Sequence, residues 1–344
     1  MKRIGVLFGQ ERTFPLALVD RINRSAAEGV EGVVAEPVSV GGVSLETPRP
    51  YDLILDRISQ DIPFYRAVLK KFAAEGTIVV NDPFWWSADD KFFNNVVARA
   101  VGVAVPKTVL LPSHDHPLDT TSASMSNLKF PLDWEAIFGH VGFPAYFKPY
   151  SGGGWKSVYR VANPDEFFAA YRQTGQIVMT LQEEIVFEDY FRCYVIGHKH
   201  VRVMRYDPRQ PHAGRYVKSA PPIDPALEEK IHGDCLKLTG ALGYDFDTLE
   251  FAVRGGIPYA IDFLNPAPDA DPSSVGEENF RWVLEHAADW LVERVTREPE
   301  PPARFHWQRL LSGSVGAAAP AAVKRPARRP AASRAKRERT GPPS

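Results

Sequence analysis

Cysteine is nearly absent from this chain of 344 residues, since only Cys193 and Cys235 occur. So few cysteines exclude a disulfide framework, and they indicate no zinc site. No apolar run is long enough to span a membrane. The run at residues 4–8 ends in Gln10-Glu11-Arg12, so it indicates a buried strand rather than a signal peptide. With 44% hydrophobic residues, the composition predicts a cytoplasmic protein with two or three domains.

Large apolar side chains are also nearly missing from residues 313–344. This segment has eight Lys and Arg residues and one Glu, a charge of +7, so the chain's net −1 leaves −8 for the rest. Such a segment cannot bury a core, and we expect residues 301–344 to form a linker and a disordered tail. Weak contact with a polyanion is one role for the tail; a solvated appendage is the favoured alternative.

The first third of the chain alternates between strand and helix patterns. We expect strands at 4–8, 51–55 and 77–80, helices at 15–24 and 63–75, and a further helix that begins at Lys91. This alternation predicts a small doubly wound α/β domain over residues 1–105. The loop after the first strand lies where such sheets bind ligands. No dinucleotide fingerprint follows it, so we assign this edge to an acceptor substrate.

Three oxygen-bearing side chains occur near the end of the folded part. Glu250 lies on one short apolar stretch, and Asp262 and Asn265 lie on the next, with the turn 254–258 between them. Two carboxylates and an amide on neighbouring strands suit Mg²⁺, which takes few protein ligands and leaves other positions to water and phosphate oxygens. An Asp that only solvates its own turn is the alternative.

A lysine followed by glycines forms a second group. Lys148 ends an extended run, and Gly152, Gly153 and Gly154 follow it before another strand. Glycines permit a loop whose backbone N–H groups turn toward phosphate oxygens. No Gly-Lys-Ser/Thr follows, so the loop is not a Walker A motif. It predicts a hairpin flap over a nucleotide, with a plain turn as the alternative.

The order of these motifs is informative. Asp90-Lys91-Phe92, the Lys148 flap, Gln182-Glu183-Glu184-Ile185, Phe191-Arg192-Cys193 and the Glu250/Asp262/Asn265 group follow one another along the chain. In that order they resemble the ATP-grasp superfamily over about residues 80–295. Within it they resemble carboxylate–amine ligases of the glutathione synthetase and ribosomal-protein-modifying glutamate ligase type.

The resemblance implies a fold and a domain order. A small doubly wound N-terminal domain would precede a two-lobed ATP-grasp unit of antiparallel sheets with helices. The small lobe with its flap would cover residues 106–185, and the large lobe with the metal site would cover 186–300. An amphipathic pattern predicts a closing helix over 277–296. A polar stretch at 113–129 predicts a loop in the small lobe.

The resemblance also implies a role for each matching residue. Lys91 and Lys148 would hold the α- and β-phosphates of ATP, under the flap of Gly152, Gly153 and Gly154. The backbone of Gln182, Glu183, Glu184 and Ile185 would meet the adenine, and Glu188 or Asp189 the ribose. Arg205 would bind the γ-phosphate or acyl phosphate, and Glu250, Asp262 and Asn265 would bind Mg²⁺, with Mn²⁺ as a substitute.

Two departures from the family pattern stand out. Asp262 and Asn265 are separated by two residues instead of one, which requires a bulge or removes Asn265 from the ligand set. Tyr190 stands where the family often has Asp, two residues before Arg192.

The implied activity is an ADP-forming ligation. A carboxylate is phosphorylated by ATP, and an amine attacks the acyl phosphate, so positioning and charge neutralisation carry the catalysis. The acceptor is expected to be an amino acid or peptide, with Arg12, Arg57, Arg192 and Arg215 as candidates for its carboxylates. Surface ion pairs explain such arginines equally well, and Arg192 could instead pair with Glu250 or Asp247. A small-molecule kinase and a catalytically silent nucleotide-binding regulator remain alternatives. The substrates and the oligomeric state stay open.

Overall fold

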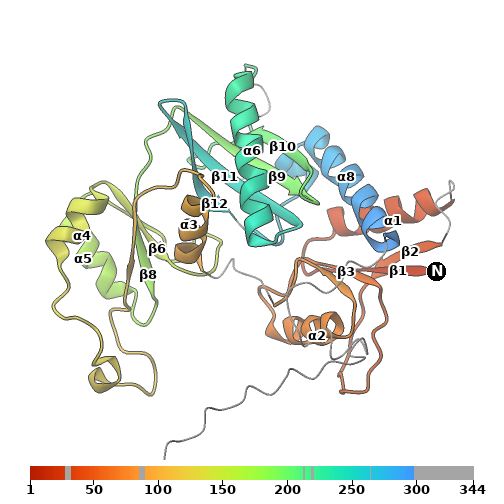
Figure 1. Cartoon of the computed structure of the whole chain (residues 1–344), viewed down its shortest axis with the longest axis horizontal. Helices are drawn as coiled ribbons and strands as arrows, with labels where there is room; N and C mark the ends of the chain where they lie inside the picture. Colours follow the sequence, from red (N-terminus) through yellow and green to blue (C-terminus); the bar gives the residue numbers. More distant parts are fainter. Residues whose placement is uncertain (28–31, 85–89, 212–213, 218–220, 264, 298–344) are drawn as a thin grey trace, which may run out of the picture.

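The structure is a computed structural model that describes residues 1–27, 32–84, 90–211, 214–217, 221–263 and 265–297. Within these residues the strands form three four-stranded sheets, and each sheet is the centre of one of three adjacent parts of the molecule (Figure 1). The first sheet and the small-lobe sheet lie at opposite ends, and the third sheet lies between them. No helix of the described part is long and apolar enough to cross a membrane. The tail that the sequence predicts to be disordered lies outside the described residues.

The first sheet is parallel, with the order β2-β1-β3-β4. Its strands are β1 (Lys2–Leu7), β2 (Val33–Pro37), β3 (Leu53–Asp56) and β4 (Ile78–Val80), and its helices are α1 (Thr13–Ala27) and α2 (Pro63–Ala74). Leu53 and Leu55 pack in the core that holds α1, whereas Ile54 packs in the core that holds α2. Helices therefore cover both faces, and the doubly wound layer expected from the sequence is confirmed.

The small-lobe sheet is antiparallel, with the order β5-β8-β6-β7. It consists of β5 (Thr108–Leu111), β6 (Ala145–Pro149), β7 (Tyr159–Val161) and β8 (Met179–Glu183), with α4 (Trp134–Val141) and α5 (Pro164–Gln173). Its core is aromatic, because Phe147 and Phe167 pack edge to face with ring centroids 5.0 Å apart. The polar stretch predicted as a loop contains only the 3₁₀ turn η1 (Ser122–Met125).

The large-lobe sheet is also antiparallel, with the order β10-β9-β11-β12. Its strands are β9 (Asp189–Ile196), β10 (His200–Arg205), β11 (Phe246–Arg254) and β12 (Ile257–Phe263). Phe191, Cys193 and Val195 face a core with α6 (Pro225–Leu242), while Tyr190, Tyr194 and Ile196 face the opposite side. Because side chains alternate along a strand, Arg192 and Glu250 also lie on this second side.

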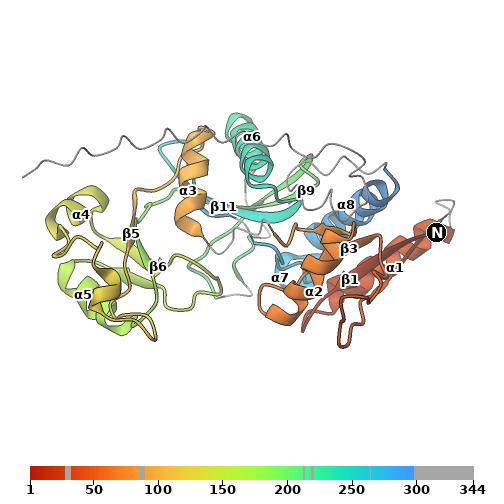
Figure 2. The same ribbon diagram turned by 60° about the horizontal axis from the view of Figure 1, so that its bottom comes forward.

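Helix α3 (Lys91–Ala100) differs from its expected place. The sequence assigns it to residues 1–105 with the first domain, yet Ala98 packs in the core beneath α6 and the large-lobe sheet. Figure 2 shows α3 between the strands of the small lobe and β11. Its buried side, formed by Asn94, Asn95 and Ala98, lies against α6 of the large lobe and β5 of the small lobe. Lys91 is thereby carried to the middle of the molecule.

Two features join the first sheet to the large lobe. Helix α8 (Glu277–Thr296), which has the bounds expected from the sequence, packs against α1 and β9, and the short α7 (Pro272–Val275) precedes it. Asn81, which is buried, donates through Nδ2 to the carbonyl of Phe246 at 2.8 Å, and its Oδ1 accepts from the N–H groups of Asp245 and Phe246, each at 2.9 Å. This side chain therefore fixes the start of β11.

Replacing Asn81 with Ala should lower the free energy of unfolding by about 2–4 kcal/mol, because it leaves buried backbone groups of β11 without partners. Urea unfolding followed by circular dichroism measures this. Asn163→Ala, which removes only the exposed N-cap of α5, is the control and should cost about 1 kcal/mol. Equal losses in the two variants would contradict the role given to Asn81.

Candidate functional site

Three charged side chains stand in a row across the large-lobe sheet. Glu250 of β11 lies directly opposite Arg192 of β9 and, on its other side, directly opposite Asp262 of β12. A β-bulge makes the second pairing possible, because the register shifts between Glu250 and Phe251 so that Ile261 is the extra residue on β12. The two carboxylates expected to bind a metal are thus cross-strand neighbours.

Glu250 is held by two donors from β9. The hydroxyl of Tyr190 donates to Oε2 at 2.6 Å, and Nη1 of Arg192 donates to Oε1 at 3.2 Å. Burial raises the pKa of Glu250; Arg192 opposes this shift and Asp262 adds to it. Burial and the adjacent Glu250 carboxylate also raise the pKa of Tyr190. Of the partners that the sequence leaves open for Arg192, the structure selects Glu250.

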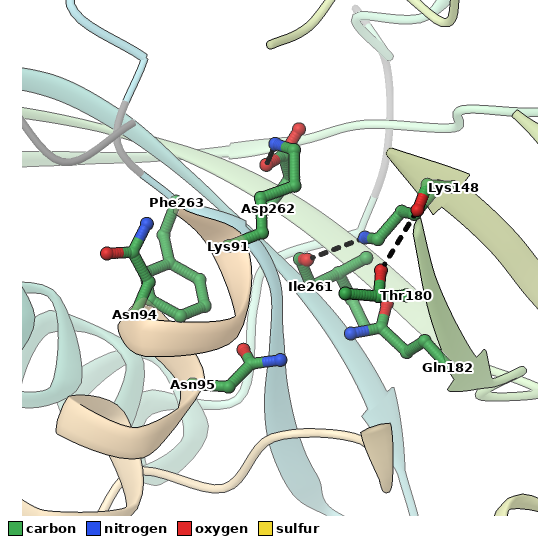
Figure 3. Close-up of a pocket in the computed structure, with 9 residues that line it drawn as sticks. All are labelled: Lys91, Asn94, Asn95, Lys148, Thr180, Gln182, Ile261, Asp262 and Phe263. Carbon is green, nitrogen blue, oxygen red and sulfur yellow. Dashed lines mark hydrogen bonds and ion pairs between the residues drawn. The ribbon is translucent and has the colours of Figure 1, made fainter. Parts of the chain in front are cut away.

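Two lysines approach Asp262 from other layers. Nζ of Lys91 lies 2.6 Å from Oδ1 of Asp262, whose side chain is 51% exposed. Nζ of Lys148 lies 3.4 Å from the carbonyl oxygen of Ile261 (Figure 3). Burial opposes ionisation of Asp262, but Lys91 and Lys148 outweigh it and lower the pKa of this carboxyl. The lysines expected to bind phosphate therefore meet the carboxylates expected to bind the metal.

Local structure fixes the position of Lys91. Asp90 caps α3 by accepting from the N–H of Phe93, and the N–H of Lys91 donates to the carbonyl of Tyr150 at 2.7 Å. This bond ties the start of α3 to the end of β6, the strand that carries Lys148. A cationic side chain in a first turn opposes the helix dipole. The nearby carboxylate of Asp262 offsets that cost.

Further polar side chains line the same cleft, and the sequence analysis misses them. Asn94 and Asn95 of α3 and Thr180 of β8 line it together with Gln182. In Figure 3 Asn95 points toward Ile261 and Gln182, whereas Asn94 lies beside Phe263. Both asparagines are buried. The available signal was their spacing, because residues three and four positions after Lys91 lie on the same helix face. The Thr180 hydroxyl donates to the carbonyl of Lys148 at 3.1 Å, which fixes that strand.

The glycine-rich flap, residues 150–157 between β6 and β7, has a left-handed backbone at several points. Gly152 and Gly154 have φ of 81° and 72°, which favours glycine there. Trp155 at its tip is 55% exposed. The guanidinium carbon of Arg215 lies 5.6 Å from the centre of the Trp155 ring, within cation–π range. The flap therefore reaches across to the loop that follows β10.

The carboxylates around the expected hinge already have protein partners. Glu183 accepts from Arg254 at 2.9 Å, and Glu184 accepts from Arg160 at 2.9 Å. Glu188 accepts from the N–H of Gly255 at 3.1 Å. Two more of the site candidates, Asp189 and Arg205, form an ion pair with each other. Ile185 is buried. For Glu183 and Glu184 the structure shows ion pairs rather than free solvated charges.

The remaining arginine candidates have different settings. Arg12 is exposed. Arg57 has a side chain with no exposed surface, and it pairs with Glu11 at 2.6 Å and donates to the carbonyl of Pro268 at 2.6 Å. Arg215 donates to the hydroxyl of Tyr206 at 3.5 Å. Arg57 is thus built into the junction between the first sheet and the large lobe, while Arg12 is open to solvent.

Asn265 follows β12, and the intervening position 264 lies outside the described residues. The N–H of Asn265 donates to Oδ1 of the fully buried Asp247 at 2.6 Å, and its own Oδ1 accepts from the N–H of Ala267 at 3.2 Å. Burial holds the pKa of Asp247 well above its usual range. The bulge that the described residues show lies just before Asp262, at Ile261.

The donor set fits a hard divalent cation. Glu250 and Asp262 face each other from adjacent strands, and such a pair of like charges favours a cation between its members. Among the described residues no group of three or more His, Cys, Asp and Glu side chains could hold a metal. Two carboxylates alone could hold Mg²⁺ only together with ligands from water and phosphate, which is how Mg²⁺ is usually bound.

Solved structures with the same arrangement of layers identify the fold. No protein-family model and no curated protein sequence matches this chain. D-alanine–D-alanine ligase from Bacillus anthracis, complexed with ATP, is similar with a TM-score of 0.59 and 16% identity, over 86% of this chain and 97% of that chain. A RimK domain ATP-grasp protein from Sphaerobacter thermophilus gives 0.60 and 17%, over 84% and 98%. The ATP-grasp ligase PsnB, complexed with minimal precursor, Mg and ADP, gives 0.55 and 14%, over 86% and 98%.

Replacing Lys148 with Met should stabilise the protein in the absence of nucleotide, by up to about 3 kcal/mol at pH 7. Burial lowers the pKa of Lys148 from 10.5 to about 8; Asp262 opposes the shift and Lys91 reinforces it. The cost of the charge is fully present below pH 8 and is relieved as the pH rises to 10.5. The advantage of Met should therefore shrink above pH 8 in thermal unfolding.

The exposed flap residue Lys156 offers a control for this experiment. Lys156→Met removes the same charge and should leave the unfolding temperature within the error at every pH. A Lys148→Met protein that is less stable than the wild type at pH 7 would contradict the prediction.

Proposed function

We propose that this chain, which has the ATP-grasp fold, is an ATP- and Mg²⁺-dependent carboxylate–amine ligase that releases ADP and phosphate. The proposal rests on one observation, the convergence of four charged side chains. Lys91, Lys148, Glu250 and Asp262 come from four separate elements and converge on a single cleft. Lysines beside a pair of carboxylates are the residue types that phosphoryl transfer uses to hold phosphates and a metal.

The roles of the individual residues follow from this geometry. Lys91 and Lys148 would bind the phosphates, and Glu250 and Asp262, with Asn265 as a further candidate, would bind Mg²⁺. The backbone of Gln182 to Ile185 would meet the adenine, and Glu188 or Asp189 the ribose. Arg205 would neutralise the transferred phosphoryl group, and the glycines of the flap would cover it. Bound Mg²⁺ would supply neutralisation of the phosphate charge.

The reaction has two steps. A carboxylate oxygen of one substrate attacks the γ-phosphorus of ATP, and the bond to the bridging oxygen breaks so that ADP leaves. The amine of the second substrate then attacks the acyl carbon, the phosphate leaves with the bonding electrons, and the nitrogen loses a proton. Lysine and arginine charges stabilise the charge that develops on the transferred group.

The acceptor is proposed to be an amino acid or a peptide with a carboxylate of its own. Arg12 and Arg215 are the more open candidates to bind it, because Arg57 and Arg192 are tied to Glu11 and Glu250. The similarity to a D-alanine–D-alanine ligase and to PsnB with its precursor agrees with such an acceptor. Its identity is a matter for experiment.

The central test uses MgATP with pools of amino acids, small peptides and carboxylates. We expect one ADP for each new product, whose mass is that of two pool members less one water. Lys148→Met and Asp262→Asn should lower turnover by at least about 100-fold, a loss of about 2.7 kcal/mol or more of transition-state stabilisation. Lys129→Met, which changes an exposed lysine of the loop 113–129, should leave turnover unchanged.

Other outcomes separate the alternatives. A phosphorylated product without condensation would favour the kinase. Tight MgATP binding without turnover over all the pools would favour the regulator, and the same pools with a macromolecular acceptor would then be the decisive comparison. Wild-type turnover in Lys148→Met would refute the proposed site.

Replacing Trp155 with Ala should uncouple ATP consumption from ligation. Trp155 at the tip of the flap contacts Arg215, and we expect this contact to hold the flap over a bound nucleotide. An acyl phosphate open to water would hydrolyse before the amine attacks. We expect more ADP per condensed product, with the ratio rising from about one to several. Trp155→Phe, which keeps a ring under the guanidinium, should restore most of the coupling. A ratio that stays at one in Trp155→Ala would remove this role from the flap tip.

A further inference from the structure

We infer that Tyr190 is a positioning residue that determines which cation the site accepts, by restricting Glu250 to coordination through a single oxygen. The inference deepens the proposed function and rests on it, since the cation is the one bound with ATP.

The first observation is that both oxygens of Glu250 already accept a hydrogen bond. Tyr190 donates to Oε2 at 2.6 Å, and Arg192 donates to Oε1 at 3.2 Å. The donors occupy the same face of β9, with Arg192 directly opposite Glu250 and Tyr190 diagonal to it. One donor on each oxygen fixes the plane of the carboxylate.

The second observation is that these donors cannot follow a rotation of Glu250. The Tyr190 side chain is buried, and its ring packs between Phe187 and Tyr206, with centroids 5.0 and 6.0 Å away. Arg192 is anchored by a second bond, from Nη2 to the hydroxyl of Thr248 at 3.2 Å. The carboxylate is therefore preorganised rather than adjustable.

A fixed carboxylate discriminates between cations of different size. Ca²⁺ takes 6–8 oxygen ligands at about 2.3–2.6 Å and often uses both oxygens of a carboxylate, whereas Mg²⁺ takes an octahedral set at about 2.0–2.1 Å. Bidentate binding would bring both oxygens of Glu250 to the ion at once, and each oxygen already uses one lone pair for a donor from β9. We expect the turn of the carboxylate that this requires to lengthen the bond from Tyr190 and so to weaken binding of the larger ion. Asp262 lacks this restraint, because its side chain is half exposed and its partner Lys91 comes from a different element, α3, rather than from the sheet. Discrimination thus depends on Glu250 and its tyrosine.

The test compares ATP binding in Mg²⁺ and in Ca²⁺ by titration calorimetry, which requires no turnover. We expect the wild type to bind ATP more tightly with Mg²⁺, and Tyr190→Phe to lower the ratio of the two affinities by about tenfold, as expected when an outer partner of a metal ligand is lost. The matched control is Tyr194→Phe. Tyr194 is a buried tyrosine of the same strand, and its hydroxyl has no hydrogen-bond partner among the described residues. In Tyr194→Phe the ratio of the ATP affinities with Mg²⁺ and Ca²⁺ should equal that of the wild type.

A second variant guards against misfolding of Tyr190→Phe. Thr248→Val keeps the shape of the side chain and removes the anchor of Arg192, so the ratio should fall in the same direction but by less. The inference is overturned if folded Tyr190→Phe keeps the wild-type ratio of the two affinities, or if it weakens ATP binding equally with both ions. MgATP binding by the wild type would in either case still support the proposed nucleotide site. If the wild type binds ATP with neither ion, the proposed function fails, and the inference fails with it.

Discussion

The pairing of Glu250 with Asp262 across two antiparallel strands is the constraint on which the site depends. Like charges directly opposite one another destabilise a sheet, and burial adds to the cost by raising the pKa of Glu250. The protein offsets this cost with cations from three elements: Arg192 from β9, Lys91 from α3 and Lys148 from β6. Each of these cations approaches the Glu250–Asp262 pair from a different element. The resulting contacts hold the small lobe and α3 against the large-lobe sheet.

The sum of these charges indicates what the cleft attracts. Three cationic and two anionic side chains leave one positive charge when Lys148 is protonated. Burial lowers the pKa of Lys148 to about 8, and Lys91 reinforces the shift although Asp262 and Glu250 oppose it. A phosphate chain would relieve the repulsion between Lys91 and Lys148, and a divalent cation would relieve that between Glu250 and Asp262, so the magnesium nucleotide of the proposed function would meet both requirements together.

Motifs and regular patterns could be predicted from the sequence, whereas packing between layers could not. The ATP-grasp fold expected from motif order is confirmed by the structural similarities, and α8 has its expected bounds, because its apolar spacing is long and regular. Strand β2 was missed, since Val33 and Val34 lead at once into Ala-Glu-Pro without alternation. The layer to which α3 belongs depends on which apolar faces remain uncovered, and the bond from Tyr190 to Glu250 depends on strand register. Neither the place of α3 nor this hydrogen bond can be predicted from a local sequence pattern.

The contacts in the cleft also describe how it would receive a ligand. Lys91 is bound to Asp262, so a proposed phosphate ligand occupies a proposed metal ligand. In the proposed function, a magnesium nucleotide would exchange these partners: the cation would take the place of Lys91 at Asp262, and a phosphate would take the place of Asp262 at Lys91. The number of ionic contacts would then not fall, and neither charge would be left unpaired, which is the costly alternative in a partly buried site. Glu250, which Tyr190 and Arg192 already hold in place, would bind the same cation without giving up a lysine partner.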